Sequence, residues 1–230
     1  MSIAENIARV RADIAAAAKE AGRKPEEITL VGASKMNGAS ACREAVAAGI
    51  DALGENRVQE MTAKLQEHAY DGAPLHFIGH LQRNKVKQVV GKVNLIQSVG
   101  SLELLEEIEK AAGKLGLVQE ILLEVNIGEE EAKSGFAPAE LLSGAEAALG
   151  REHVTVLGLM TIPPADAERE ENLRYFDKVR ALFLDMNEKL FHNRLQVLSM
   201  GMSGDYEDAV RAGATMVRVG TAIFGSRHYT

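Results

Sequence analysis

The sequence has one cysteine, Cys42, no tryptophan and only 4% aromatic residues. A lone cysteine excludes a disulfide within the chain and is typical of a reducing compartment. The scarcity of aromatic side chains argues against a stacking platform for single-stranded nucleic acid. The 33 acidic residues outnumber the 26 basic ones, which gives a net charge of −7. Nucleic-acid binding needs a cationic surface, so this class of function is disfavoured.

Long hydrophobic runs are also missing. No stretch approaches the roughly 18 apolar residues that a membrane span needs. Charged residues interrupt the first 20 positions, so we expect neither a signal peptide nor a membrane anchor. Together with the lone cysteine, this predicts a cytoplasmic protein.

What is present is a regular alternation of short Val-, Ile- and Leu-rich runs with longer amphipathic segments. The expected strands are residues 28–34, 50–53, 75–78, 93–97, 120–125, 154–159, 195–199 and 216–219. The expected helices are residues 3–21, 39–48, 57–68, 82–90, 102–115, 138–149, 167–190 (one long helix or a pair) and 205–212. Strands that alternate with helices indicate a parallel sheet.

Eight such units predict an α/β fold, a single (β/α)₈ TIM-type barrel with an extra N-terminal helix and a short tail after the last strand. The extra helix would close one end of the barrel or pack outside it. We treat residues 1–230 as one domain, because no linker or break in composition divides them. The rival architecture is an open doubly wound sheet, which usually has about five or six strands.

Lys35 is the first candidate functional residue, because active sites of such barrels lie where the strands end. If Val31 and Ala33 point into the barrel, alternation along the strand places Lys35 on the same face. Partial desolvation at the barrel mouth lowers the pKa of a lysine and makes its amine available for a Schiff base with a carbonyl. The alternative is a lysine whose ammonium simply reaches water.

The loops after the seventh and eighth strands form a candidate phosphate cradle. Ser203 offers a hydroxyl, and Gly204, Gly220 and Thr221 offer backbone N–H groups, in loops that commonly bind phosphate in these barrels. Glycine lets the backbone approach a phosphate closely. The alternative for Ser203 is a plain N-cap of the following helix.

Arg218 is expected to point into the barrel, because Val217 and Val219 occupy the opposite face of its strand. A buried guanidinium has five donors and no acceptor, so it suits a ring nitrogen with a lone pair or a carboxylate. The alternative is a structural ion pair, for example with Glu124.

A Schiff-base lysine, a phosphate cradle and a partner for a ring nitrogen together describe pyridoxal 5′-phosphate (PLP), which carries an aldehyde, a phosphate and a pyridine. Arginine keeps the ring nitrogen unprotonated, which weakens the electron sink that PLP enzymes use.

Seven stretches of the chain match a known family. They are VGASK (31–35), GENRVQE (54–60), HFIGHLQRNK (76–85), LEVNIGEEEAKSG (123–135), GLMTI (158–162), LSMGMSGDYEDAV (198–210) and VRVGTAIFGSR (217–227). On these stretches the chain resembles the pyridoxal phosphate homeostasis proteins, which share the barrel of alanine racemase. The resemblance implies a mostly monomeric protein that binds PLP and helps to balance or deliver it to apoenzymes, without established catalytic turnover.

The resemblance also implies roles for individual residues. It matches Lys35 to the lysine that holds PLP, Arg218 to the arginine that faces the pyridine nitrogen, and Asn56 to an asparagine beside the ring. Met200 and His80 match positions near the pocket. The phosphate contacts implied by the resemblance are Ser203, Gly204, Gly220 and Thr221.

Three positions depart from the pattern of the family. The segment 36–39 lacks a Thr-Lys-Pro-type run, Leu75 replaces a frequent tryptophan, and Gly100 replaces a common aspartate. The first and third departures can alter access to the pocket or its polarity.

Two enzyme functions compete with a PLP carrier. A two-base racemase needs an acid–base group on each face of the substrate carbon. None of the tyrosines stands at a strand end, so we expect racemisation to be absent or weak; they are Tyr70, Tyr175, Tyr206 and Tyr229. A Schiff-base aldolase for sugar phosphates explains Lys35 and the phosphate loops but leaves Arg218 without a role.

Overall fold

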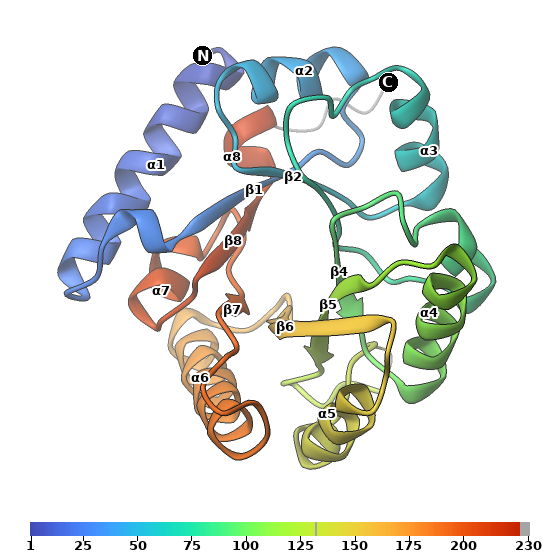
Figure 1. Ribbon diagram of the computed structural model, residues 1–230. Helices are drawn as coiled ribbons and strands as arrows, with labels where there is room; N and C mark the ends of the chain where they lie inside the picture. Colours follow the sequence, from blue (N-terminus) through green and yellow to red (C-terminus); the bar gives the residue numbers. More distant parts are fainter. Residues whose placement is uncertain (132, 226–230) are drawn as a thin grey trace. The chain divides into compact units, whose positions relative to one another are not determined.

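The computed structural model describes residues 1–131 and 133–225. Tyr229 and the end of the last family motif, residues 226–227, lie outside the described residues. The strands form a closed parallel barrel in the order β1 to β8 (Figure 1), which confirms the predicted TIM-type fold. The strands are β1 Thr29–Ala33, β2 Ala52–Glu55, β3 Leu75–Phe77, β4 Leu95–Val99, β5 Gln119–Val125, β6 Val154–Thr161, β7 Val197–Ser199 and β8 Met216–Val219.

Helices follow the strands along the chain. The α-helices are α1 Ile3–Glu20, α2 Ala39–Ala47, α3 Val58–Gln66, α4 Leu102–Leu115, α5 Leu141–Leu149, α6 Arg169–Phe191, α7 Tyr206–Arg211 and α8 Thr221–Phe224. Short 3₁₀ helices are η1 Pro25–Glu27, η2 Arg83–Gln88 and η3 Pro138–Glu140. Among the described residues, no helix is long and apolar enough to cross a membrane.

The chain divides into two compact units, which we describe separately. Unit 1 comprises Met1–His76 and Met200–Thr230, and unit 2 comprises Phe77–Ser199. In unit 1, α1 begins with a capping box formed by Ser2 and Glu5. Its buried side chains recur at helical spacing, from Ile7 through Val10 to Ile14. The helix packs against α2, α7 and α8 (Figure 1), so it lies outside the strands of this unit.

In unit 2, strands β5 and β6 contribute a fully buried apolar core that includes Ile121, Leu122 and Leu123. The buried apolar face of helix α4 includes Leu105 and Ile108. Its bounds, Leu102–Leu115, match the prediction, because Ser101 caps its start and Gly116 ends it in the left-handed region.

Several predicted elements differ from those observed. Strand β2 begins at Ala52, two residues later than expected. Asp51, in the loop just before it, uses its carboxylate to accept the Leu30 N–H and to form an ion pair with Arg11 of α1. The predicted helix 82–90 is the 3₁₀ helix η2. Buried Val86 and Val89, just after it, are three residues apart, which suits this tighter turn.

Two further differences lie at the end of the chain and in its longest helix. The segment after the last strand forms helix α8 instead of a tail. The segment 167–190, expected as one long helix or a pair, forms the single helix α6, Arg169–Phe191.

Candidate functional site

All eight residues predicted to bind a cofactor belong to unit 1. They are Lys35, Asn56, Met200, Ser203, Gly204, Arg218, Gly220 and Thr221. Arg218 lies within β8, Thr221 begins α8, and the other six lie in segments that follow a strand. The structure therefore places the whole predicted set within one compact part of the chain.

The loops on either side of β8 meet at Ser203. Its hydroxyl oxygen accepts hydrogen bonds from the backbone N–H groups of Gly220 and Ala222, at 3.1 and 3.4 Å. The alternative of a plain N-cap on the next helix is wrong, because the N-cap of α7 is Asp205. Ser203 instead joins the loop before α7 to the start of α8, and these are the two loops predicted to form the phosphate cradle.

Two glycines shape the loop before α7: Gly201 allows it to pack closely against Ala209, and Gly204 leaves its backbone open to a ligand. Gly201 has φ +94°, and a Cβ there would lie 2.5 Å from the Cβ of Ala209, so only glycine fits. A Cβ at Gly204 would meet no heavy atom within 4 Å, so the backbone of this exposed residue is accessible. The loop thus combines a fixed turn at Gly201 with open backbone at Gly204.

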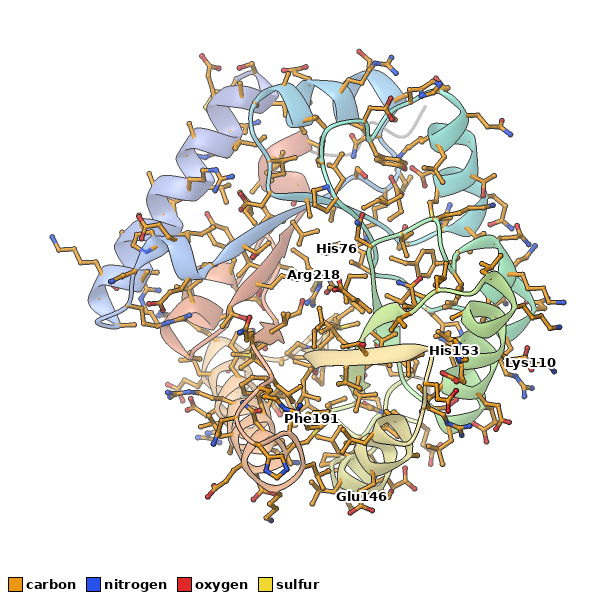
Figure 2. All side chains as sticks on the ribbon, in the orientation of Figure 1. His76, Lys110, Glu146, His153, Phe191 and Arg218 are labelled. Carbon is orange, nitrogen blue, oxygen red and sulfur yellow. The ribbon has the colours of Figure 1, made fainter. Side chains whose placement is uncertain are left out.

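Arg218 and Met200 occupy the interior of unit 1. Arg218 is 3% exposed and is paired in register with Val31 of β1. Its side chain lies on the face of β8 away from α7 (Figure 2), which agrees with the predicted orientation. The Arg218 N–H donates to the Gly201 carbonyl at 3.0 Å, and Met200, which is fully buried, donates its N–H to Met216 at 3.1 Å. These bonds fix the loop before α7 against β8.

Lys35 is half-buried in the loop that follows β1. The prediction extended strand alternation to this residue, but β1 ends at Ala33, so alternation does not determine where Lys35 points. The prediction for the strand itself holds. A Cβ at Gly32 would meet Leu53 and Phe224, so Gly32 faces the α8 side and its neighbours Val31 and Ala33 face the other side.

Asn56 carries a buried acceptor atom that a ligand could satisfy. Its side-chain Oδ1 is buried and makes no hydrogen bond within the described part of the chain. A buried acceptor without a donor is costly and uncommon in a native structure. A bound molecule that carries a donor would satisfy it.

A buried ionic cluster that includes Ser34, the residue before Lys35, was not predicted from the sequence. The fully buried carboxylate of Glu55 accepts hydrogen bonds at Oε1 from three donors: the Ser34 hydroxyl at 2.6 Å, the Lys64 ammonium at 2.6 Å and the Tyr70 hydroxyl at 3.0 Å. Lys64 also contacts Glu60 Oε1 at 2.7 Å. We call these five residues the Glu55 cluster.

Burial and hydrogen bonding shift the pKa values of the Glu55 cluster. Desolvation raises the pKa of Glu55 despite its three donors. For Lys64, desolvation alone would lower the pKa, but hydrogen bonds to Glu55 and Glu60 outweigh it and raise the pKa above its ordinary value. Desolvation and the neighbouring Glu55 raise the pKa of Tyr70, so its phenol stays neutral. The sequence signals were Glu55 at a predicted strand end and the Glu60–Lys64 spacing of four.

The remaining candidates, His80 and Glu124, belong to unit 2. His80 belongs to unit 2, where it lines a cavity of about 650 Å³ together with Arg83, Ser98 and Lys133. Glu124, considered above as an ion-pair partner, also lies in unit 2 and accepts a hydrogen bond from Ser134 at 2.9 Å. The described ranges contain no group of three or more His, Cys, Asp or Glu side chains suited to a metal ion.

The tyrosines within the described residues are bonded to carboxylates. Tyr70 donates to Glu55, and Tyr206 donates to Asp13 at 2.8 Å. Tyr175 donates to Glu171 at 3.1 Å on the surface of α6.

The sequence model of the alanine racemase N-terminal domain family matches residues 5–228. A pyridoxal phosphate homeostasis protein from Aquifex aeolicus is 44% identical over 229 residues, which cover 100% of both chains. The chain belongs to the pyridoxal phosphate homeostasis protein family.

Solved structures extend the likeness. PipY of Synechococcus elongatus, solved with PLP bound, superimposes with a TM-score of 0.85 at 35% identity, covering 97% of this chain and all of PipY. Alanine racemase from Clostridium difficile gives a TM-score of 0.71 at 18% identity, covering 88% of this chain and 56% of the racemase. This second likeness shows the fold alone, and it means that the fold family includes enzymes.

Proposed function

We propose that this protein binds PLP in unit 1, holds it as a Schiff base on Lys35, and serves in the homeostasis and delivery of PLP. The observation that carries the proposal is the PLP-bound structure of PipY, a relative that matches nearly the whole chain. Two features of this chain fit the cofactor: the buried Oδ1 of Asn56 lacks a partner in the described structure, and the two glycine-containing loops meet at Ser203.

Each proposed contact follows from the chemistry of the residue. Ser203 offers its hydroxyl proton, and Gly204 and Thr221 offer N–H groups, to the phosphate. The Gly220 N–H donates to the Ser203 oxygen and so positions this hydroxyl beside the same loop. The amine of Lys35 adds to the aldehyde carbon, and water leaves as the covalent bond forms. Asn56 and Met200 lie beside the ring. Arg218 has only donors, so it faces an unprotonated ring nitrogen.

We propose a carrier and not an enzyme, because Arg218 limits the chemistry that bound PLP can supply. PLP in catalysis acts as an electron sink, and this role is strongest when the ring nitrogen is protonated. A guanidinium at that nitrogen opposes protonation. The racemase alternative needs a second base, and the hydroxyls of Tyr70 and Tyr206 are already hydrogen-bonded to Glu55 and Asp13. A weak amino-acid racemase is the alternative function.

We further propose that the protein acts as a cytoplasmic monomer, with the whole chain as one PLP-binding domain. The single buried thiol of Cys42 and the absence of a membrane-spanning helix among the described residues support this setting. Its partners are PLP and PLP-dependent apoenzymes, without nucleic acid or membrane.

The first test is the visible spectrum of the purified protein with added PLP, before and after borohydride reduction. We expect a yellow band that reduction removes, with the added mass mapped to Lys35. Lys35→Ala should abolish the band, while Lys189→Ala, which changes an exposed lysine, should preserve it. Absence of a band with excess PLP would refute the proposal and favour the sugar-phosphate aldolase.

Two further measurements separate the carrier from the racemase. Transfer of PLP to an apoenzyme should be measurable, whereas a saturable racemase rate that Lys35→Ala abolishes would establish the alternative. Ser203→Ala should release PLP about tenfold faster, because it removes a donor to the phosphate. Ser143→Ala, which removes an exposed hydroxyl in unit 2, is the matched control.

A further inference from the structure

Two side chains of α3 hold the backbone on both sides of Lys35. Lys64 Nζ donates to the carbonyl oxygen of Ser34 at 2.9 Å. Glu60 Oε1 accepts the N–H of Met36 at 2.5 Å. The residues immediately before and after the proposed PLP lysine are therefore both fixed to one helix.

The two side chains are also fixed to each other and to the interior. Lys64 and Glu60 contact at 2.7 Å, one helical turn apart, and Lys64 contacts Glu55 at 2.6 Å. The exposed fractions of the side chains fall from 20% for Glu60 to 6% for Lys64 and 0% for Glu55. Because the inner end of this chain of contacts is buried and bonded on several sides, the outer end cannot move freely.

Met36 shows that the loop conformation is imposed on the backbone. Its φ is +63°, in the left-handed region that residues other than glycine rarely adopt. The residue is 51% exposed, so burial does not explain this conformation. The Asn37 N–H donates to the Ser34 carbonyl at 3.1 Å and closes a turn with Met36 at its third position, and the Met36 N–H donates to Glu60, so the turn and Glu60 hold this conformation together.

We infer that Glu60 and Lys64 are positioning residues that clamp the Lys35 loop and thereby set how long PLP is retained. This inference rests on the proposed function of Lys35. A charge-assisted hydrogen bond to each flanking peptide group limits the orientations of the Lys35 backbone, so the amine stays aligned with the phosphate cradle of the same unit. Release of the clamp would let the loop move and PLP escape faster.

The test compares three variants with the wild-type protein. Glu60→Ala removes the acceptor for the Met36 N–H. Glu60→Gln keeps an acceptor oxygen but removes the charge. Asp185→Ala is the matched control, because it removes an ion pair of the same i,i+4 spacing from α6, at 2.8 Å from Lys189.

Three measurements are made on each protein. Hydrogen exchange reports the Met36 amide directly. Competitive acetylation, read by mass spectrometry across pH without PLP, reports the reactivity of the Lys35 amine. The rate of PLP loss from the loaded protein reports retention.

In Glu60→Ala, we expect exchange at Met36 and loss of PLP to be about tenfold faster, because one charge-assisted hydrogen bond is lost. The acetylation profile of Lys35 should move toward that of an exposed lysine. Glu60→Gln should remain within about twofold of wild type, because its amide oxygen still accepts the Met36 N–H. Asp185→Ala should match wild type in all three measurements.

Three results would overturn the inference. One is unchanged exchange at Met36 in Glu60→Ala. Another is faster exchange with the same PLP loss and Lys35 profile as Asp185→Ala. The third is an equal increase in Met36 exchange and in PLP loss in Glu60→Gln and Glu60→Ala, which would mean that the charge of Glu60 and not its hydrogen bond to Met36 is responsible. If wild type retains no PLP, the proposed function fails, whereas the Lys35 acetylation profile still decides on the clamp.

Discussion

Helices α3 and α6 contain almost the same ion pair in different surroundings. On α3, Lys64 and Glu60 lie 2.7 Å apart with side chains 6% and 20% exposed. On α6, Lys189 and Asp185 lie 2.8 Å apart with side chains 58% and 46% exposed. Spacing along the helix and distance agree, but only the α3 pair is connected to buried groups and to backbone. The comparison shows that the geometry of an ion pair does not by itself determine how much the pair contributes to stability; its burial and its other partners matter as well.

The largest effect should come from breaking the buried pair. Lys64→Met keeps the apolar stem but leaves Glu55 buried without its cationic partner, which we expect to lower the free energy of unfolding by about 3–5 kcal/mol. Chemical denaturation at pH 8 measures this. A loss below about 1 kcal/mol would mean that protonation of Glu55, whose pKa is already raised by desolvation, compensates for the missing charge.

His76 extends the comparison to acid stability. Desolvation lowers its pKa from the ordinary 6.5 to about 4. As the pH falls, the unfolded state binds the proton first, so stability that is complete above pH 6.5 is lost as the pH falls through about 4. The difference in unfolding free energy between wild type and His76→Gln should fall by about 3 kcal/mol over this range.

The control for this prediction is His68→Gln, because the His68 side chain is 78% exposed. Its curve of stability against pH should run parallel to that of wild type. If the curve of stability against pH for His76→Gln also runs parallel to that of wild type, protonation of His76 does not contribute to the loss of stability in acid.

The tyrosines give a third, smaller contrast. Tyr70→Phe removes a buried hydroxyl that donates to Glu55 at 3.0 Å, and should cost about 2 kcal/mol, because the acceptor is charged. Tyr175→Phe removes an exposed hydroxyl bonded to Glu171 at 3.1 Å, and should not change the denaturation midpoint. Equal midpoints for the two variants would contradict the importance of burial.

The smallest effect should come from the surface pair itself. Lys189→Met should change the free energy of unfolding by less than about 0.5 kcal/mol, because water screens the exposed charges. The effect should shrink further in high salt. If Lys189→Met lowered the free energy of unfolding as much as Lys64→Met, burial would not explain the difference between the ion pairs of α3 and α6.

The fold could be predicted from sequence because alternating apolar runs encode strands locally. The prediction of β8, Met216–Val219, was correct to the residue, and that of β1 was correct to within one residue at each end. The start of β2 could not be predicted, because Asp51 makes its bonds to Leu30 and Arg11, which are far away in sequence. Such tertiary hydrogen bonds leave no periodic signal.

The candidate site divides in the same way. Ser203, Gly220 and Lys35 were identifiable from residue type and from position at strand ends. That Ser203 bonds to the start of α8 and not to α7 depends on how the two loops meet. Lys64 could not be recognised, because a lysine on an amphipathic helix normally reaches water. Its burial depends on Glu55, contributed by a different element.

The left-handed turn at Met36 has a consequence for how this segment can vary among relatives. Glu60 accepts the peptide N–H and not a side-chain group, so this hydrogen bond does not itself require a methionine at position 36. Proline is excluded, because it has no N–H and its ring fixes φ near −65°, and a β-branched residue is disfavoured, because it rarely adopts φ +63°. Departure from a Thr-Lys-Pro-type run in residues 36–39 therefore leaves the contact between Glu60 and the Met36 N–H in place in this chain.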